Sequence, residues 1–200
     1  MRVLPYGKRA VLIEVDDSAT ALQLHIDLRD EPGVIDCVPA ARTVLVRYEK
    51  RTDLARLAAR AAEVLAQEHT PMPVGEPVTL NVRYDGADLA STAEELGMGV
   101  DDLVERHTAA EYVVGFCGFS PGFAYLSGLD PRLHIPRLAS PRTSVPAGSV
   151  AIAGEYAGVY PRRSPGGWRL LGTTDAIVWD VTRADPALLT PGTVVRFRAA

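Results

Sequence analysis

The sequence holds one five-residue motif typical of a catalytic serine, at residues 118–122 (GFSPG). In hydrolases with the G-x-S-x-G pattern, the serine lies on a tight turn between a strand and a helix, and the backbone N–H of the next residue helps to stabilise the oxyanion. Here the next residue is Pro121, which has no backbone N–H to donate. Gly122 and Gly128 also disfavour a helix directly after the turn. We therefore expect that Ser120 is not a nucleophile.

The histidines and cysteines are too scattered to predict a metal site. The sequence has four histidines and two cysteines, and none of them stands at a spacing typical of a metal centre. One histidine, His107, ends a predicted helix just before the glycine-rich stretch, where the helix carbonyl groups favour the charged imidazolium. We include His107 among the candidate site residues and expect no metal.

Neither common nucleotide-binding fingerprint is present. A phosphate-binding loop needs a lysine after its glycines, and the only lysines, Lys8 and Lys50, lack that setting. The glycines between Gly115 and Gly128 do not open a helix after a strand, which the dinucleotide fingerprint requires. Any nucleotide must therefore bind without either motif.

Aromatic residues and arginines gather among many glycines and prolines between Gly115 and Trp168. Glycine and proline at this density make tight turns, aromatic rings supply flat apolar walls, and Arg137 or Arg142 offers a fork for a carboxylate. Apolar walls with a few polar anchors are typical of a small-molecule pocket, although the same residues also suit barrel corners and a core. The candidate pocket residues are His107, Phe119, Pro121, Gly122, Phe123, Tyr125, Arg142, Tyr160, Gly166, Gly167 and Trp168.

Two of these residues carry a specific expectation. We expect Arg142 and His107 to face the pocket, with Trp168 packed beside it. If Arg142 binds a substrate carboxylate, its replacement by alanine should lower turnover far more than stability.

The composition is that of an ordinary globular protein and disfavours several function classes. The chain has 200 residues, of which 47% are hydrophobic and 23% charged, with a net charge of -4. Its arginines are scattered rather than clustered, which disfavours nucleic-acid binding. No run approaches the about 20 apolar residues of a membrane span, and the N-terminus lacks the apolar core of a secretory signal. We expect a cytoplasmic protein that binds neither nucleic acid nor membrane.

The first part of the sequence predicts a small α/β domain over residues 1–76. Its order is β-α-β-β-α, a small sheet with helices on one face. We expect strands at residues 10–15, 34–38 and 43–48, one helix capped by Asp17 and Ser18, and another capped by Thr52. Residues 69–77 (HTPMPVGEP) contain three prolines and a glycine, so the domain boundary is placed there.

Residues 77–200 predict a second, mostly antiparallel β domain. A strand at 78–84 and helices at 88–96 and 100–108 come first. Short apolar runs then alternate with Gly/Pro turns, which is typical of an antiparallel barrel or sandwich. These runs are residues 112–116, 149–153, 168–171, 176–180 and 193–198.

The glycine- and proline-rich stretch resembles the family variously called KipI, allophanate hydrolase subunit 1 or the 5-oxoprolinase B subunit (PxpB). The family pattern runs GF-x-PGF-x-YL-x-GL, PR, PR, VP-x-GSV, G-x-YP and SPGGW, in that order. Here it occupies residues 118–123, 125–126, 128–129, 136–137, 141–142, 145–150, 158–161 and 164–168. The first half of the chain matches more loosely.

This resemblance implies a fold and a function. The fold is α+β: a small N-terminal α/β domain followed by a cyclophilin-like antiparallel β-barrel. The function is that of one subunit of an ATP-dependent 5-oxoprolinase, which opens the cyclic amide of 5-oxoproline to give glutamate. The implied partners are a KipA/PxpC-type subunit and a LamB/YcsF (PxpA)-type subunit. ATP is used by the assembled complex, and this chain is expected to be inactive alone.

The sequence departs from the family pattern at Ala157, where a threonine is usual, and at Thr173 and Asp175, where arginine and proline are common. These differences concern the substrate rather than the fold.

Three other functions stay open at this point. Related modules form the carboxyltransferase part of biotin-dependent urea carboxylase, so carboxyl transfer in urea or allophanate metabolism is one. The KipI name implies an inhibitor of a sensor histidine kinase, although the sequence holds no kinase-docking signal. The fold also suggests a prolyl isomerase, but a fold does not determine a function.

Overall fold

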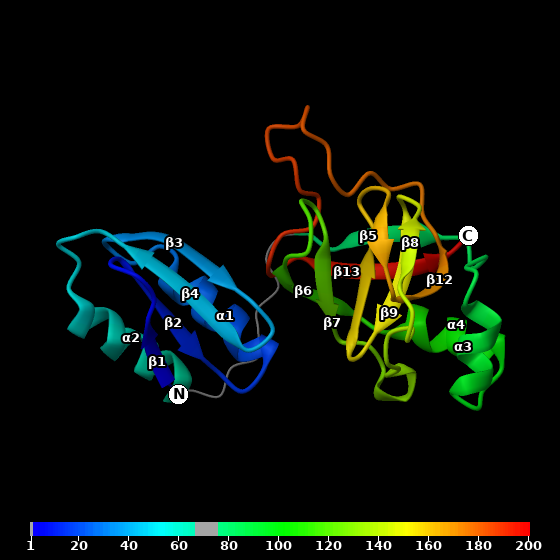
Figure 1. Cartoon of the computed structure of the whole chain (residues 1–200), viewed down its shortest axis with the longest axis horizontal. Helices are drawn as coiled ribbons and strands as arrows, with labels where there is room; N and C mark the ends of the chain where they lie inside the picture. Colours follow the sequence, from blue (N-terminus) through cyan, green and yellow to red (C-terminus); the bar gives the residue numbers. More distant parts are fainter. Residues whose placement is uncertain (1, 67–75) are drawn as a thin grey trace. The chain divides into compact units, whose positions relative to one another are not determined.

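The computed structural model describes residues 2–66 and 76–200. The chain divides into two compact units, Met1–Met72 and Pro73–Ala200. Of the interdomain linker predicted at residues 69–77, residues 69–75 lie outside the described residues. The structure bears out the predicted α+β class, with a small helix-covered sheet in the first unit and a nearly closed barrel in the second (Figure 1).

The first unit is a four-stranded antiparallel sheet with order β1-β2-β4-β3. Alternate residues of the strands pack against α1 and α2, and a buried core including Ile13, Val44 and Leu24 joins the two layers. Strand β1 was not predicted from the sequence. The elements are β1 (Arg2–Pro5), β2 (Ala10–Glu14), α1 (Ser18–Leu28), β3 (Val34–Pro39), β4 (Thr43–Tyr48) and α2 (Leu54–Ala66).

The two helices of this unit begin differently from each other. Asp17 caps α1 as predicted, since its carboxylate accepts a hydrogen bond from the Thr20 N–H at 2.8 Å. For α2 the prediction of Thr52 was wrong by one residue: the Asp53 carboxylate accepts from the next turn, at 3.0 Å from the Ala55 nitrogen. The Thr52 hydroxyl instead donates to the carbonyl of Gly33 at 3.0 Å.

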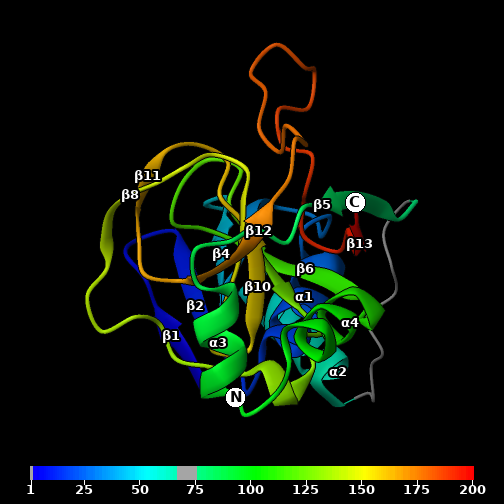
Figure 2. The same ribbon diagram turned by 90° about the vertical axis from the view of Figure 1, so that its right-hand side faces the viewer.

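The second unit is built around a seven-stranded sheet with order β12-β9-β10-β7-β6-β13-β5. All neighbours pair antiparallel except β13 and β5, which are parallel. The sheet elements are β5 (Val78–Val82), β6 (Tyr112–Cys117), β7 (Ala124–Ser127), β9 (Ser149–Ala153), β10 (Tyr156–Val159), β12 (Arg169–Thr173) and β13 (Val194–Ala199). Beside it lie α3 (Leu89–Glu95), α4 (Val100–Ala109), the 3-10 turn Pro131–Leu133, and a two-stranded ribbon of β8 (Arg142–Val145) and β11 (Ser164–Gly166) (Figure 2).

The two edges of the sheet meet and nearly close the barrel. The Arg83 N–H donates to the carbonyl of Thr173 at 2.9 Å, and the Thr173 N–H donates back at 2.8 Å. Gly172 allows this approach, because a Cβ there would overlap the Arg83 carbonyl oxygen. The barrel interior is an apolar core that includes the fully buried side chains of Leu80, Leu126 and Ile152.

The strand predicted at residues 176–180 was wrong. The segment between β12 and β13 is instead a long projecting loop, drawn in orange in Figures 1 and 2. Asp180 starts a turn there, since its carboxylate accepts from both the N–H and the hydroxyl of Thr182. The sheet pairing in this loop is one bridge, Trp179 to Ala187. No helix in the described part of the chain is long and apolar enough to cross a membrane.

Candidate functional site

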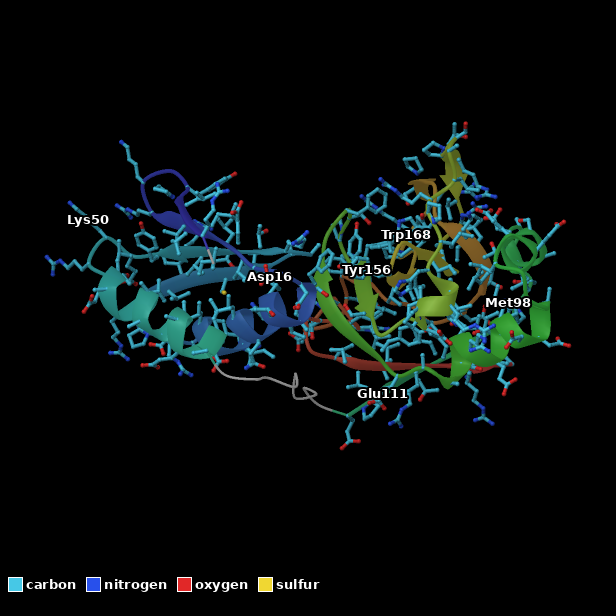
Figure 3. All side chains as sticks on the ribbon, turned by 90° about the horizontal axis from the view of Figure 1, so that it is seen from below. Asp16, Lys50, Met98, Glu111, Tyr156 and Trp168 are labelled. Carbon is cyan, nitrogen blue, oxygen red and sulfur yellow. The ribbon has the colours of Figure 1, made fainter. Side chains whose placement is uncertain are left out.

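Seven aromatic side chains of the second unit pack into one group on the outside of the barrel sheet. Successive strand residues point to opposite faces, so Val150 and Ile152 of β9 enter the barrel core while Ala151 and Ala153 lie on the outer face with the rings. We call this group the aromatic cluster. Its members are Phe116, Phe119, Phe123, Tyr125, Tyr156, Tyr160 and Trp168 (Figure 3).

The rings are in close, defined contact. Tyr125 is central: it stacks on Phe116 with ring centroids 4.3 Å apart, and its edge meets Trp168 at 5.5 Å. Phe123 packs edge-to-face with Tyr160 at 5.3 Å and with Trp168 at 5.2 Å. Such pairs stabilise a fixed arrangement beyond the area that they bury.

Two glycines allow this packing. At Gly158 a Cβ would lie 3.1 Å from the Trp168 ring and 3.2 Å from Phe123. At Gly166 it would overlap the hydroxyl of Tyr160. The density of glycine in this stretch therefore serves ring packing, as well as turns.

The cluster has a buried base and a partly exposed rim. Phe123 and Tyr160 are each 2% exposed and Trp168 is 8% exposed, so these three predicted pocket walls form a core. Tyr125 is half-buried, and Phe119 is 58% exposed. The base fixes the rim, and the rim is the part that a ligand can reach.

The G-x-S-x-G segment is the hairpin that joins β6 to β7. The Gly118 N–H donates to the Phe123 carbonyl at 3.1 Å, and the Phe123 N–H donates to the Ser120 carbonyl at 3.0 Å. The chain enters a strand after the turn, whereas a nucleophile elbow requires a helix. Phe119 has a φ of 63°, the left-handed region that non-glycine residues rarely adopt. Of the other predicted site residues here, Pro121 is exposed at the tip.

Gly122 lies in the same hairpin with a φ of 82°. It contacts Trp179 of the projecting loop, where a Cβ on the glycine would come within 2.5 Å of the Trp179 Cβ. The contact joins the hairpin to the loop.

Arg142 on β8 is committed to an ion pair. Its Nη2 donates to Asp88 at 2.6 Å, and the same carboxylate accepts from the Leu170 N–H at 2.8 Å. Asp88 is 5% exposed. This pairing corrects the prediction of a free fork for a substrate carboxylate, because the charge of Arg142 is already balanced. Its Nη1 is buried without a hydrogen-bond partner, so one donor remains for a neutral acceptor.

His107 does not lie with the aromatic cluster. It is fully buried between α4 and the barrel, with its Nδ1 2.7 Å from the Tyr84 hydroxyl and its ring 4.6 Å from that of Phe197. Burial lowers its pKa to about 3. The expectation of a charged imidazolium was therefore wrong, since desolvation outweighs the helix carbonyls. The His107 carbonyl itself accepts from the Tyr112 hydroxyl at 3.0 Å.

Gly167 holds a neighbouring loop against the cluster. Its carbonyl accepts from the Leu138 N–H at 2.7 Å. On the other side of Arg137, the Ile135 carbonyl accepts from the Gly154 N–H, also at 2.7 Å. Residues 135–138 are therefore fixed beside Trp168 and Tyr156, which follow these glycines closely in the chain.

Other features add no further site. Two cavities of the second unit, of about 380 and 260 Å³, lie away from the rings, the first lined by residues such as Glu105 and Arg106 and the second by Asn81 and Thr174. Among residues 2–66 and 76–200, no three His, Cys, Asp or Glu side chains group as metal ligands would. Burial raises the pKa of the Cys117 thiol to about 11, so this cysteine is a poor nucleophile.

The sequence reasoning missed two parts of the arrangement. Asp88 stands 54 positions from Arg142, and no local pattern joins them. Phe116 and Tyr156 were not included among the candidates, although both lie close to glycines of the same stretch.

Comparison with known proteins decides the family. Residues 1–189 match the family model described as the carboxyltransferase domain, subdomain C and D. The 5-oxoprolinase B subunit of Escherichia coli O157:H7 is 40% identical over 96% of this chain and 92% of its own length. That of Bacillus subtilis is 34% identical over 92% of this chain and 83% of its own.

The chain belongs to the family of 5-oxoprolinase B subunits. The resemblance seen in the sequence motifs is thereby confirmed.

Solved structures agree with this membership. A protein from Pyrococcus horikoshii, PH0987, is 32% identical with a TM-score of 0.61, and the match covers 100% of this chain and 97% of that chain. The structure titled TTHA0988 is 38% identical with a TM-score of 0.78, but the match spans 40% of that longer chain. The Kluyveromyces lactis urea amidolyase, at 20% identity and a TM-score of 0.70, shares the fold.

Proposed function

We propose that this chain is the B subunit of a 5-oxoprolinase, which hydrolyses the cyclic amide of 5-oxoproline to glutamate. The observation that carries the proposal is the 40% identity to a protein named as the B subunit of 5-oxoprolinase, over nearly the whole of both chains. The other two curated relatives bear the same name, at 34% and 32% identity.

The chemistry of the site is consistent with a shared role. The aromatic cluster offers apolar surface and tyrosine hydroxyls, Arg142 offers one donor, and Arg137 offers a charge. These groups bind and orient a small ring, whereas general acid–base chemistry needs a group that titrates near neutral pH. Since Ser120 and His107 do not serve, we place the activating groups on a partner chain, and we expect this chain to be inactive alone.

We further propose that ring opening uses ATP. Hydrolysis of the amide adds one water across its C–N bond, and ATP activates the amide oxygen or the attacking water for that step. This chain has no phosphate-binding loop, so the nucleotide is assigned to the assembled complex.

Two partner types follow from the family. We propose a KipA/PxpC-type subunit and a LamB/YcsF (PxpA)-type subunit, working together with this chain in the cytoplasm, where ATP is available. The longer relative TTHA0988, of which this chain matches 40%, supports a second polypeptide region that works beside a chain of this kind.

The test is to express this chain with both partner types, purify the complex through a tag on this chain, and assay glutamate formed from 5-oxoproline. We expect activity in the complete mixture with ATP, and none from this chain alone or when ATP is left out. A complete, assembled complex that forms no glutamate would contradict the proposal.

Carboxyl transfer is the second candidate, favoured by the description of the matching family model. It requires a biotin carrier, whereas the oxoprolinase reaction does not. Activity that persists when avidin removes biotinylated proteins supports hydrolysis, and a carboxylated product that depends on them supports transfer.

A further inference from the structure

Two guanidinium groups lie beside the aromatic cluster, and only one of them is neutralised. Arg142 is paired with the buried carboxylate of Asp88 at 2.6 Å. Arg137 is exposed, and the described part of the chain provides its side chain with no hydrogen-bond or ion-pair partner. A free, fixed positive charge at the edge of a group of rings is the element that a small anionic ligand requires.

The backbone around Arg137 is held on both sides. Ile135 and Leu138 are hydrogen-bonded to Gly154 and Gly167, each at 2.7 Å. The carbonyl of Pro136 also accepts from the Arg169 Nε at 3.3 Å. An arginine on a fixed backbone loses less conformational entropy on binding than one on a free loop.

The same anchors put Arg137 next to the rim of the cluster. Gly154 lies two residues before Tyr156, and Gly167 lies directly before Trp168. Both of these rings contact Tyr125, at centroid distances of 5.7 and 5.5 Å. Burial raises the pKa of the Tyr125 hydroxyl, and the positive charge of Arg137 opposes that shift, as it does at Tyr160.

We propose that Arg137 binds the carboxylate of the substrate, with the ring of the substrate lying against the rim of the aromatic cluster at Tyr125. The inference rests on the proposed function, because it takes 5-oxoproline as the ligand. That molecule is a five-membered ring with one carboxylate and a neutral cyclic amide, so a single free guanidinium matches its charge. Arg142, whose charge Asp88 balances, does not compete for the carboxylate.

The test uses the assembled complex with three variants of this chain: Arg137→Ala, Arg137→Lys and the control Arg162→Ala, which changes another arginine of the same unit. Loss of a charged hydrogen bond should raise the KM for 5-oxoproline about 10-fold or more in Arg137→Ala, with kcat changed much less. Arg137→Lys should recover part of the affinity, and Arg162→Ala should match the wild type.

A neutral probe reports on the rest of the site. The compound 2-pyrrolidinone has the same ring without the carboxylate, so its inhibition constant should be equal in the wild type and in Arg137→Ala. An unchanged KM in Arg137→Ala, or an equal loss of affinity for both compounds, overturns the inference.

Titration of the wild-type complex with 5-oxoproline separates failure of the inference from failure of the proposed function. Binding that is lost in Arg137→Ala, without any hydrolysis by the wild type, supports the inference and contradicts the function. Hydrolysis with an unchanged KM in Arg137→Ala contradicts the inference and leaves the function standing. No binding to the wild type overturns both.

Discussion

At the scale of single residues, the partners of each charged group decide what it is able to do. Arg142 and Arg137 are alike in the sequence, since each follows a proline in the same stretch. In the structure Arg142 is tied to Asp88, while the side chain of Arg137 is exposed without such a partner. The first is therefore a structural group with one spare donor, and the second is the group open to a ligand.

This difference predicts a large stability effect at Arg142. Replacing Arg142 with alanine leaves the carboxylate of Asp88, which is 5% exposed, without its charge partner. We expect the free energy of unfolding to fall by about 3 kcal/mol, measured by urea denaturation. This replaces the expectation from the sequence that activity would suffer far more than stability.

Arg162 gives the matched control for that experiment. Its replacement by alanine should change the unfolding free energy by less than about 0.5 kcal/mol. If Arg142→Ala is as stable as Arg162→Ala, the Asp88 pair does not support the fold as described.

His107 predicts a pH dependence of stability. Its pKa of about 3 in the folded chain lies below the ordinary value near 6.5, so protons bind preferentially to the unfolded chain. Its contribution is complete above about pH 6.5 and is lost as the pH falls toward 3, at up to about 1.4 kcal/mol per pH unit. Between about pH 6 and about pH 4.5, the wild type should lose about 2 kcal/mol more than His107→Phe, which cannot titrate. Parallel unfolding curves for the two proteins would show that His107 is not held neutral.

At the scale of elements, glycines let the β8–β11 ribbon and the barrel strands approach the rings. Gly166→Ala should cost about 1 to 3 kcal/mol in unfolding free energy, because its Cβ overlaps the buried Tyr160 side chain. Gly118→Ala is the control: its Cβ would meet Tyr125 at an ordinary 3.7 Å. Equal stability of the two variants, measured by thermal unfolding, would mean that the ribbon yields without cost.

The elements that were predicted correctly are those with strong local patterns. Helices α1 and α4 and strands β4 and β9 have clear periodicity or capping residues, and their observed bounds lie within one or two residues of those expected. The strands that were missed, β7, β8, β10 and β11, have three or four residues each and pair with other short segments of the unit. Tertiary pairing, rather than local propensity, makes them strands.

The candidate site was predictable in composition but not in arrangement. The sequence motifs pointed to the right stretch, and Phe119, Phe123, Tyr125, Tyr160 and Trp168 do come together. Which rings are buried, and the partner of Arg142, depend on contacts between segments far apart in the chain. Those contacts leave no signal in the local spacing.

At the scale of the whole molecule, each unit has its own buried core. We expect a fragment of residues 76–200 to fold alone, because its apolar core draws on residues of that unit only. Its near-ultraviolet circular dichroism should show fixed aromatic packing and a cooperative thermal transition. A fragment that exposes its apolar core and unfolds without cooperativity would contradict this independence.

The central claim is that this chain is a necessary part of a 5-oxoprolinase complex. Its most direct test compares the complete mixture with one that lacks this chain, measuring ADP and glutamate released on addition of 5-oxoproline. We predict that both products form together in the complete mixture and that both are lost when the chain is omitted. Equal glutamate formation without the chain would contradict the claim.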